Sequence, residues 1–531
     1  MNLNKLKCLA FAAIVGFAGT AQAADSGGEF NFVAPYDGSI LSLDPHKTSK
    51  QQDLLVTNNI FRSLYMWSAE HRKPMLELAN LESVSDDGLT YTYKLHADMM
   101  FHNGRAMKAS DIVYSYERML SMKPVSPNAG HIQIIQGAKA FESGEADHVE
   151  GLSVLDDLRF SITLNDRVDP AYYFYRPGTA IVPQEAVEAA GDEFGLSPVG
   201  SGPFKFEEWV KGSEVKLSKF DNYFEAQKPY LDKLNFKILQ EGSTRDIAFR
   251  ANELDAILVE ASQYPQYKAD PSYSEHLVEV AEMFTRLISW NADYAPLSDK
   301  KVRQAISYAI DEDTINKKFL KGKAYNPVGW LPSTSEAFDA NGKGFGYDVE
   351  KAKALMAEAG YADGFELEIL GTANKSYGVG VAEVVGQYLS KIGITVTTQQ
   401  LEGGILYDKL VAGDFQGIIW SFGSGVEPLK ALKRWHSTTA NDSGNYVKYN
   451  NPEYDALLDK AQTTNDEQKR VEYLQAADRI FADDAAVWLF NYNKAVLAVQ
   501  PWVHGIEPVA IEIMYQDFAD VWVDANSPRA K

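Results

Sequence analysis

The apolar residues between positions 89 and 120 change from a period of two to a helical period. Tyr91, Tyr93 and Leu95 alternate with polar residues, which predicts a half-buried strand. A His-Asn-Gly turn follows at 102–104, and Ser-Asp at 110–111 is a typical start of a helix. Beyond it the apolar residues recur at helical spacing: Ile112, Val113, Tyr116, Met119 and Leu120. The segment is therefore predicted to form a strand, a turn and a helix.

Later in the chain, predicted helices alternate with short predicted strands. Apolar stripes predict helices over 299–310, 348–359 and 379–392, the second beginning at the cap Asp348 and ending at Gly360. Runs rich in β-branched and apolar residues predict strands at 365–370 and 394–399, and another at 30–34. This alternation is typical of an α/β layer.

The length of 531 residues predicts about three domains. Turn residues are concentrated at 198–203 and 291–296, which we interpret as domain boundaries. No internal repeat and no low-complexity linker separates the parts. We therefore expect domains that share segments of the chain rather than independent domains in a row.

The N-terminus has the pattern of an export signal. Lys5 and Lys7 precede an apolar run at 9–19, and the small-residue site Ala21-Gln22-Ala23 follows, so we expect cleavage after Ala23. The only cysteine, Cys8, lies within the segment to be removed, which leaves no thiol for a disulfide, a nucleophile or a lipid anchor. No later apolar run is long enough to span a membrane. We expect an exported protein without a membrane anchor.

Charge and motifs narrow the possible functions. The net charge of -22 opposes binding to nucleic acid or to an anionic lipid surface. The metalloprotease, phosphate-loop, dinucleotide-binding and serine-hydrolase motifs are all missing, and none of the nine histidines forms an i, i+4 pair. We therefore predict no metal site, no cofactor and no enzymatic activity.

A set of motifs resembles one known family. The segments at 87–95, 101–105 and 109–118 are similar to the signature of the bacterial extracellular solute-binding proteins of family 5, the oligopeptide and dipeptide binders of ABC importers. Further similar residues occur along the chain, at 43–46, 181–183, 200–204, 222–224 and 228–232, and later at 291, 302–311 and 347–348 through 360–361. The resemblance covers essentially the whole chain after the export signal.

This resemblance implies an α/β fold, a two-lobed periplasmic binding protein of type II, similar to cluster C, with an additional subdomain and a hinge between the lobes. The expected divisions are a signal peptide at 1–23, a first lobe made of 24–68, 200–280 and 499–531, an additional subdomain at 69–199, and a second lobe at 281–498. Such a hinge works because the solute contacts both lobes only in the closed state.

The function that the resemblance implies is that of a monomeric periplasmic receptor of an ABC importer. It would capture a peptide or peptide-like solute by lobe closure and deliver it to the permease, whose transmembrane subunits work with cytoplasmic ATPases. One alternative is the same role for a sugar-like or opine-like solute. Others are a secreted carbohydrate hydrolase, suggested by the acidic balance and the many aromatic residues, and a periplasmic chaperone or sensor.

The sequence departs from the family at the expected ligand anchor. Peptide-binding members commonly carry Trp-x-x-Asp in the second lobe, where the aspartate pairs with the α-ammonium of the peptide. Here the run is Trp420-Ser421-Phe422-Gly423, so a glycine stands in the place of that aspartate. A buried ammonium without its counter-charge costs several kcal/mol. Glu427 is a candidate substitute, provided that the loop bends toward the ligand.

Other candidate ligand-binding residues are aromatic or polar. Trp420, Phe422 and Trp435 offer stacking faces, whereas Ser424 and His436 offer hydrogen bonds to a polar solute. Tyr36, just after the strand predicted at 30–34, is a candidate for the cleft wall. Packing in the core is the competing interpretation for Trp420 and Tyr36, and a plain surface position is the competing one for Trp435 and His436.

Overall fold

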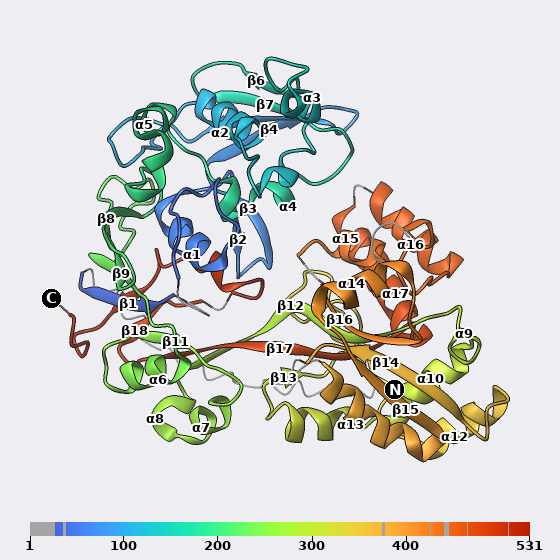
Figure 1. Ribbon diagram of the computed structural model, residues 1–531. Helices are drawn as coiled ribbons and strands as arrows, with labels where there is room; N and C mark the ends of the chain where they lie inside the picture. The colour runs from blue at the N-terminus through green and yellow to red at the C-terminus, as the bar shows by residue number, and fades with distance from the viewer. Residues whose placement is uncertain are drawn as a thin grey trace, which may run out of the picture.

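The computed structural model describes residues 27–34, 39–373, 378–424, 426–439, 445–464, 466–507 and 509–530. The predicted export signal and Tyr36 lie outside the described residues. The chain forms two lobes, and two long strands run between them (Figure 1). An additional subdomain lies next to the first lobe (Figure 1).

The first lobe contains a four-stranded sheet in which β1 pairs with β10 in parallel and the other strands are antiparallel. Its strand order is β1 (Glu29–Val33), β10 (Lys233–Lys237), β9 (Glu214–Lys219) and β8 (Phe204–Val210). The remaining elements of this lobe are α1 (Gln51–Ile60), α6 (Gly242–Arg250), β11 (Ala256–Leu258), α7 (Tyr264–Ala269), α8 (Pro271–Ser274), β18 (Val503–His504) and β19 (Trp522–Val523). Phe30, Phe32, Phe236 and Phe518 pack together in its core.

The subdomain has its own antiparallel sheet and its own core, in which Tyr93 stacks on Phe160. The sheet order is β4 (Ala79–Val84), β5 (Thr90–Leu95), β7 (Arg159–Thr163) and β6 (Leu152–Val154). The other elements are the hairpin β2 (Tyr65–Ser68) and β3 (Lys73–Leu76), and the helices α2 (Ala109–Ser121), α3 (Ala138–Ser143), α4 (Ala171–Phe174) and α5 (Gln184–Ala190).

The second lobe is built on a seven-stranded sheet. Its order is β11, β17 (Val487–Val499), β12 (Leu277–Trp290), β16 (Gly417–Gly423), β14 (Phe365–Gly371) and β15 (Ile394–Gln400), while β13 (Ala324–Tyr325) pairs with β17. The helices are α9 (Ala295–Ser298), α10 (Lys300–Ala309), α11 (Glu312–Thr314), α12 (Val349–Glu358), α13 (Val379–Leu389), α14 (Gly403–Ala412), α15 (Pro428–Lys433), α16 (Pro452–Thr463) and α17 (Glu467–Asp484).

Helices cover both faces of this second sheet. Successive strand residues point to opposite faces, and accordingly Ile418 packs in one apolar cluster with Trp330 while Ile419 packs in another with Val302. In Figure 1, α14 to α17 lie on one side of the sheet and α10, α12 and α13 lie on the other. Burial on both faces explains why β14 and β16 contain consecutive apolar residues.

The two long strands β12 and β17 connect the lobes. One end of β17 pairs with β11 of the first lobe, whereas the far end of β12 pairs with β16 of the second lobe. The register of β12 against β17 shifts between Ala281 and Thr285, so the pairing is interrupted at the crossing point. At the interruption, the Met283 N–H donates instead to Ala510 O, and Met283 O accepts from the Ser424 N–H. This irregularity is the natural position for a hinge.

The elements predicted from periodicity are confirmed. The strand and helix predicted within 89–120 are β5 and α2, and the helix predicted at 299–310 is α10, whose Asp299 side chain caps the Lys301 N–H. Asp348 caps α12, and Gly360 adopts a positive φ just after its end. The strands predicted at 365–370 and 394–399 are β14 and β15, which pair in parallel across the helix α13. Local pattern therefore determined these boundaries to within about two residues.

Asp478 of α17 makes the stability of the protein depend on pH. It is 4% exposed and accepts hydrogen bonds from the backbone N–H groups of Trp330 and Leu331 at 2.6 and 3.2 Å. Burial outweighs these two donors and raises the pKa of Asp478 to about 7. The folded protein therefore binds this proton more tightly than the unfolded chain does.

We predict that the free energy of unfolding decreases as pH rises from about 4 to 7, by up to about 1.4 kcal/mol per pH unit from this group alone. Asp478→Asn cannot take up the proton, so its unfolding free energy should depend less steeply on pH. Urea titrations at several pH values test this. Glu472→Gln on the exposed face of the same helix is the matched control, and an unchanged slope in Asp478→Asn would contradict the prediction.

Candidate ligand-binding site

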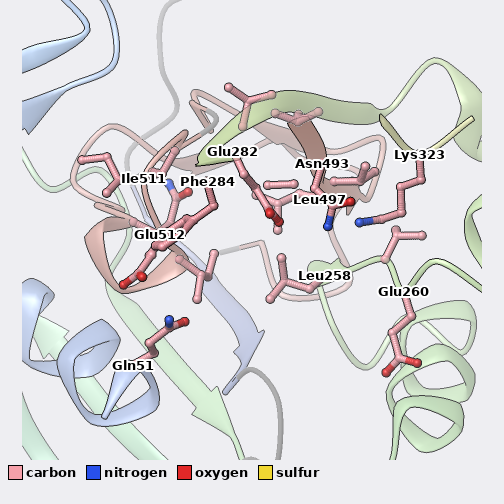
Figure 2. A pocket seen from close by; sticks show the side chains of 18 of the residues that line it. Gln51, Leu258, Glu260, Glu282, Phe284, Lys323, Asn493, Leu497, Ile511 and Glu512 are labelled. Carbon is pink, nitrogen blue, oxygen red and sulfur yellow. The ribbon is translucent and has the colours of Figure 1, made fainter. Parts of the chain in front are cut away.

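A cavity of about 580 Å³ lies where the crossing strands pass between the lobes. Its walls come from β12, β16 and β17, from the turn before β13, and from β1, β11, the start of α1 and the segment 509–516. Residues from both lobes therefore line one space. Figure 2 shows this cavity with its lining side chains.

An apolar belt surrounds the middle of the cavity. Leu258 and Leu497 are opposite each other in the pairing of β11 with β17, and both line the cavity. Val280 and Phe284 of β12 and Ile511 of the C-terminal segment extend the belt. These side chains follow from strand alternation, because residues two apart point to the same face. The belt suits an apolar portion of a solute.

Charged and polar side chains gather on the second-lobe side of this belt. Glu282 and Arg286 of β12 form an ion pair at 3.6 Å, and Ser421 of β16 lies opposite Arg286 in the sheet. Figure 2 shows Glu282, Asn493 and Lys323 pointing toward one another. Burial lowers the pKa of Lys323, with further lowering from Arg286, while Glu282 opposes the change. Both signs of charge are thus present at this end.

The first-lobe side offers an acid and amides. Gln51 at the start of α1 has a buried side-chain oxygen with no hydrogen-bond partner among the described residues. Glu512 lies in the segment 509–516, and burial raises the pKa of its carboxyl, which Glu282 raises further and Arg176 lowers. Arg245 also lines the wall, but it is tied to Glu260 at 2.8 Å and to two backbone oxygens. The acid and amides left facing the cavity are suited to a cationic group.

Gly423 lies at the edge of this cavity. It ends β16 and pairs with Phe284, which lines the cavity, and the residue is exposed. A Cβ added at Gly423 would have only Phe284 Cε1 nearby, at 3.9 Å. Ser424 follows and is fully buried, with its N–H donating to Met283 O at 2.8 Å and its hydroxyl unpartnered among the described residues. Both residues therefore adjoin the interruption in β12.

The aromatic candidates lie on the opposite face of β16. Trp435 is 0% exposed, stacks on Phe481 and packs edge-on against Trp330. Phe422 belongs to the same apolar cluster, and Trp420 is half-buried beside Tyr407 at a centroid distance of 5.8 Å. The structure thus places both Trp435 and Phe422 in the core of the second lobe. Strand alternation turns Phe422 away from Ser421 and the cavity, and Trp435, just after α15, packs on the same apolar cluster.

Glu427 and His436 do not line the cavity described above. Glu427 lies at the start of α15 in a second cavity of about 810 Å³, between the subdomain residues Asp169 and Tyr173 and the helices α15 to α17. Burial raises its pKa to about 7, and Lys430 opposes this. His436 is 8% exposed and lies 3.7 Å from Asp455 and 3.6 Å from Asp459. These two residues are not brought together with Gly423.

Sequence reasoning missed the charged and amide residues of the crossing strands. Glu282 and Arg286 stand in β12 among apolar residues, and Asn491 and Asn493 stand in β17 in the same way. Polar side chains two or four positions apart in an otherwise apolar strand were the available signal. Glu512 and Lys323 lie in irregular segments and gave none.

The sequence model of the bacterial extracellular solute-binding proteins, family 5 Middle, matches residues 73–444. The chain belongs to this family. The resemblance seen in its motifs is therefore confirmed, and so is the two-lobed α/β fold of the family's binding proteins.

Individual relatives extend the match over most of the chain. The glutathione-binding protein GsiB of Pectobacterium atrosepticum is 28% identical over 476 residues, which is 86% of this chain and 87% of that protein. The dipeptide-binding protein of Escherichia coli K12 is 26% identical and covers 81% of this chain and 82% of its own length. A solved structure, the unliganded open form of the periplasmic murein tripeptide-binding protein MppA, superposes with a TM-score of 0.84 at 22% identity, covering 94% and 97% of the two chains.

These relatives are named for what they bind, so they do not favour the hydrolase alternative. Within the part of the chain that the structure describes, no group of three or more histidines, cysteines and acids is placed to hold a metal ion. Among the same residues, no helix combines the length and the apolar character needed to cross a membrane.

Proposed function

We propose that this family member is the periplasmic receptor of an ABC importer and captures a peptide or peptide-like solute. It would be exported, with its signal cleaved after Ala23, and would deliver the solute as a monomer to the transmembrane permease subunits. One observation carries this proposal: the cavity at the hinge is lined by both lobes and has an apolar middle between charged ends. The names of the relatives support the class of solute.

Lobe closure follows from the position of the cavity. The segments 24–68, 200–280 and 499–531 would move as one lobe with the subdomain 69–199, and 281–498 as the other, about the interruption in β12. A solute in the cavity contacts Glu512 from one side and Arg286 from the other. Because both contacts form fully only when the lobes approach, binding shifts the protein toward the closed state.

The arrangement of charges suits a short zwitterion with an apolar side chain. Glu512 and Gln51 offer acceptors for an ammonium on the first-lobe side. This pair would supply the counter-charge that Gly423 does not. The apolar belt then receives a side chain of the peptide, at roughly 25 cal/mol per Å² of buried apolar surface.

Thermal unfolding with a panel of solutes tests the proposed function. The panel contains di- to pentapeptides, glutathione, oligosaccharides and opine-like amines. A bound peptide present at 100 times its dissociation constant should raise the unfolding free energy by about 2.7 kcal/mol. Stabilisation by oligosaccharides alone, or by no member of the panel, would contradict a peptide receptor.

Gly423→Asp is expected to increase affinity for a peptide with a free α-ammonium by about tenfold relative to its N-acetylated form, which corresponds to ~1.4 kcal/mol. The open space at Gly423 accepts the side chain, and the new carboxylate can pair with the ammonium. Isothermal titration calorimetry with the two peptides measures the ratio. Gly403→Asp adds the same charge to the same lobe away from the cavity and is the control. An unchanged ratio in Gly423→Asp would show that the ammonium binds elsewhere.

A further inference from the structure

The additional subdomain contacts the second lobe directly, apart from the crossing strands. The Lys73 ammonium of β3 lies 2.8 Å from Glu467 of α17 and 3.9 Å from Glu336. The Tyr172 hydroxyl of α4 donates to Glu336 at 3.0 Å. This contact joins two bodies that are proposed to rotate about the interruption in β12, so lobe closure must change it.

The second cavity, of about 810 Å³, lies beside this contact and has walls from both bodies. Asp169 lines it from the subdomain, just before α4, and Glu427 lines it from the second lobe, at the start of α15. Figure 1 shows α4 and α15 on the facing sides of the subdomain and the second lobe. Rotation of one body toward the other therefore narrows this cavity and brings the two acids closer together.

Groups of both signs surround Glu427. Burial raises its pKa to about 7, although Lys430 and Arg470 oppose the change. Asp169 of the subdomain and Glu336 of the second lobe raise the pKa further. The nearby cations therefore do not cancel the cost of burying this carboxylate. The other charged or titratable groups at the cavity and the contact are Lys73, Tyr91, Asp166, Arg167, Tyr172 and Tyr173 of the subdomain, and Lys433 and Glu467 of the second lobe.

Asp169 is affected in the same direction. Burial raises its pKa, and Glu467 of the second lobe raises it further. The Ala171 N–H donates to Asp169 at 2.9 Å and opposes the rise, as do Arg470 and Lys73. Each acid is thus made harder to ionise by an acid of the other body. Because desolvation and Coulomb repulsion both grow as like charges approach, lobe closure favours the neutral form of one carboxyl.

We propose that Asp169 and Glu427 control lobe closure by taking up one proton between the subdomain and the second lobe. The proton comes from the solvent and binds a carboxylate oxygen of one of them, which leaves one negative charge on the pair in place of two. This inference rests on the proposed function and deepens it by assigning a regulation to the same receptor: solute capture is favoured in mildly acidic surroundings. The closed state binds the proton more tightly than the open state. The gain in affinity is therefore present below about pH 7 and is lost as pH rises through the higher pKa of the closed state.

Calorimetric titration in two buffers of different ionisation enthalpy measures the protons taken up when the tightest-binding peptide of the panel binds. At about pH 7.5 the wild-type protein should take up roughly half a proton more than Glu427→Gln, because the amide cannot titrate. Protons exchanged by the peptide itself are common to both proteins and cancel in this difference. The ratio of the affinity at about pH 6 to that at about pH 8 should be at least about threefold larger in the wild type than in Glu427→Gln.

Two further variants separate the acid pair from folding and from charge in general. Asp169→Asn keeps an oxygen for the Ala171 N–H and should also reduce the proton uptake, because Glu427 loses the acid that faces it. Glu453→Gln removes an exposed acid at the start of α16 in the same lobe and should behave as the wild type. Wild-type proton uptake in either Glu427→Gln or Asp169→Asn overturns the control of closure alone. Failure of every peptide to bind the wild type overturns the proposed function, and this inference with it.

Discussion

Ala495→Trp is expected to abolish peptide binding, with an affinity loss greater than a hundredfold, while the protein remains folded. Ala495 lies on β17 opposite Val280, and both line the cavity at the hinge. An indole at this position occupies the space of the apolar belt, and it also prevents the lobes from approaching. Because the side chain enters an existing cavity of about 580 Å³, it need not displace the packed core. Thermal unfolding with and without the tightest-binding peptide measures both effects.

The matched control for this variant is Ala357→Trp. Ala357 is exposed on α12, in the same lobe but outside the cavity. This variant should keep the full ligand-induced stabilisation. Equal ligand-induced stabilisation in both variants would mean that the solute does not use the cavity.

Asp44→Ala should lower the free energy of unfolding by about 3–5 kcal/mol, because it leaves a buried charge without its partner. Asp44 is 0% exposed and binds the Arg118 guanidinium through two hydrogen bonds, at 2.6 and 3.0 Å. Arg118 belongs to α2 of the subdomain, so this pair joins the subdomain to the N-terminal segment of the first lobe. Urea unfolding followed by tryptophan fluorescence measures the change.

Asp192→Ala provides the comparison for an exposed ion pair. Lys47 lies three residues after Asp44, and its Nζ is 2.8 Å from a carboxylate oxygen of Asp192. The Asp192 side chain is fully solvent-exposed. Removing it should change the unfolding free energy very little, because water and salt screen such pairs. Equal destabilisation by both substitutions would show that burial does not govern the strength of the Asp44 interaction.

Periodicity alone was enough to locate the regular elements of the second lobe. The stripe that includes Val302 and Ile306 packs in one apolar cluster with residues of the sheet, and the run that became β14 is largely buried, whereas β15 buries Ile394 and is mostly exposed beyond it. Such patterns are local, so they can be recognised within a window of one element. The caps Asp299 and Asp348 are equally local, because each bonds to a backbone N–H within three residues.

The candidate site was much harder to predict, because its walls come from distant parts of the chain. Gln51, Lys323 and Glu512 meet at one cavity although hundreds of residues separate them. Trp435 shows the converse: it follows the charged residues Lys433 and Arg434, yet Phe481 and Trp330 bury it completely. Only the tertiary structure determines which side of β16 faces the cavity. For this reason the residues proposed to bind the solute are mostly not those that the motif comparison suggested.

A crystal structure of the protein with the tightest-binding peptide of the panel tests the central claim most directly. The account predicts peptide density between β12, β17 and the segment 509–516, with the two lobes rotated toward each other about the interruption at 281–285. Peptide density outside this cavity, or an arrangement of the lobes that is the same with and without the peptide, would contradict it.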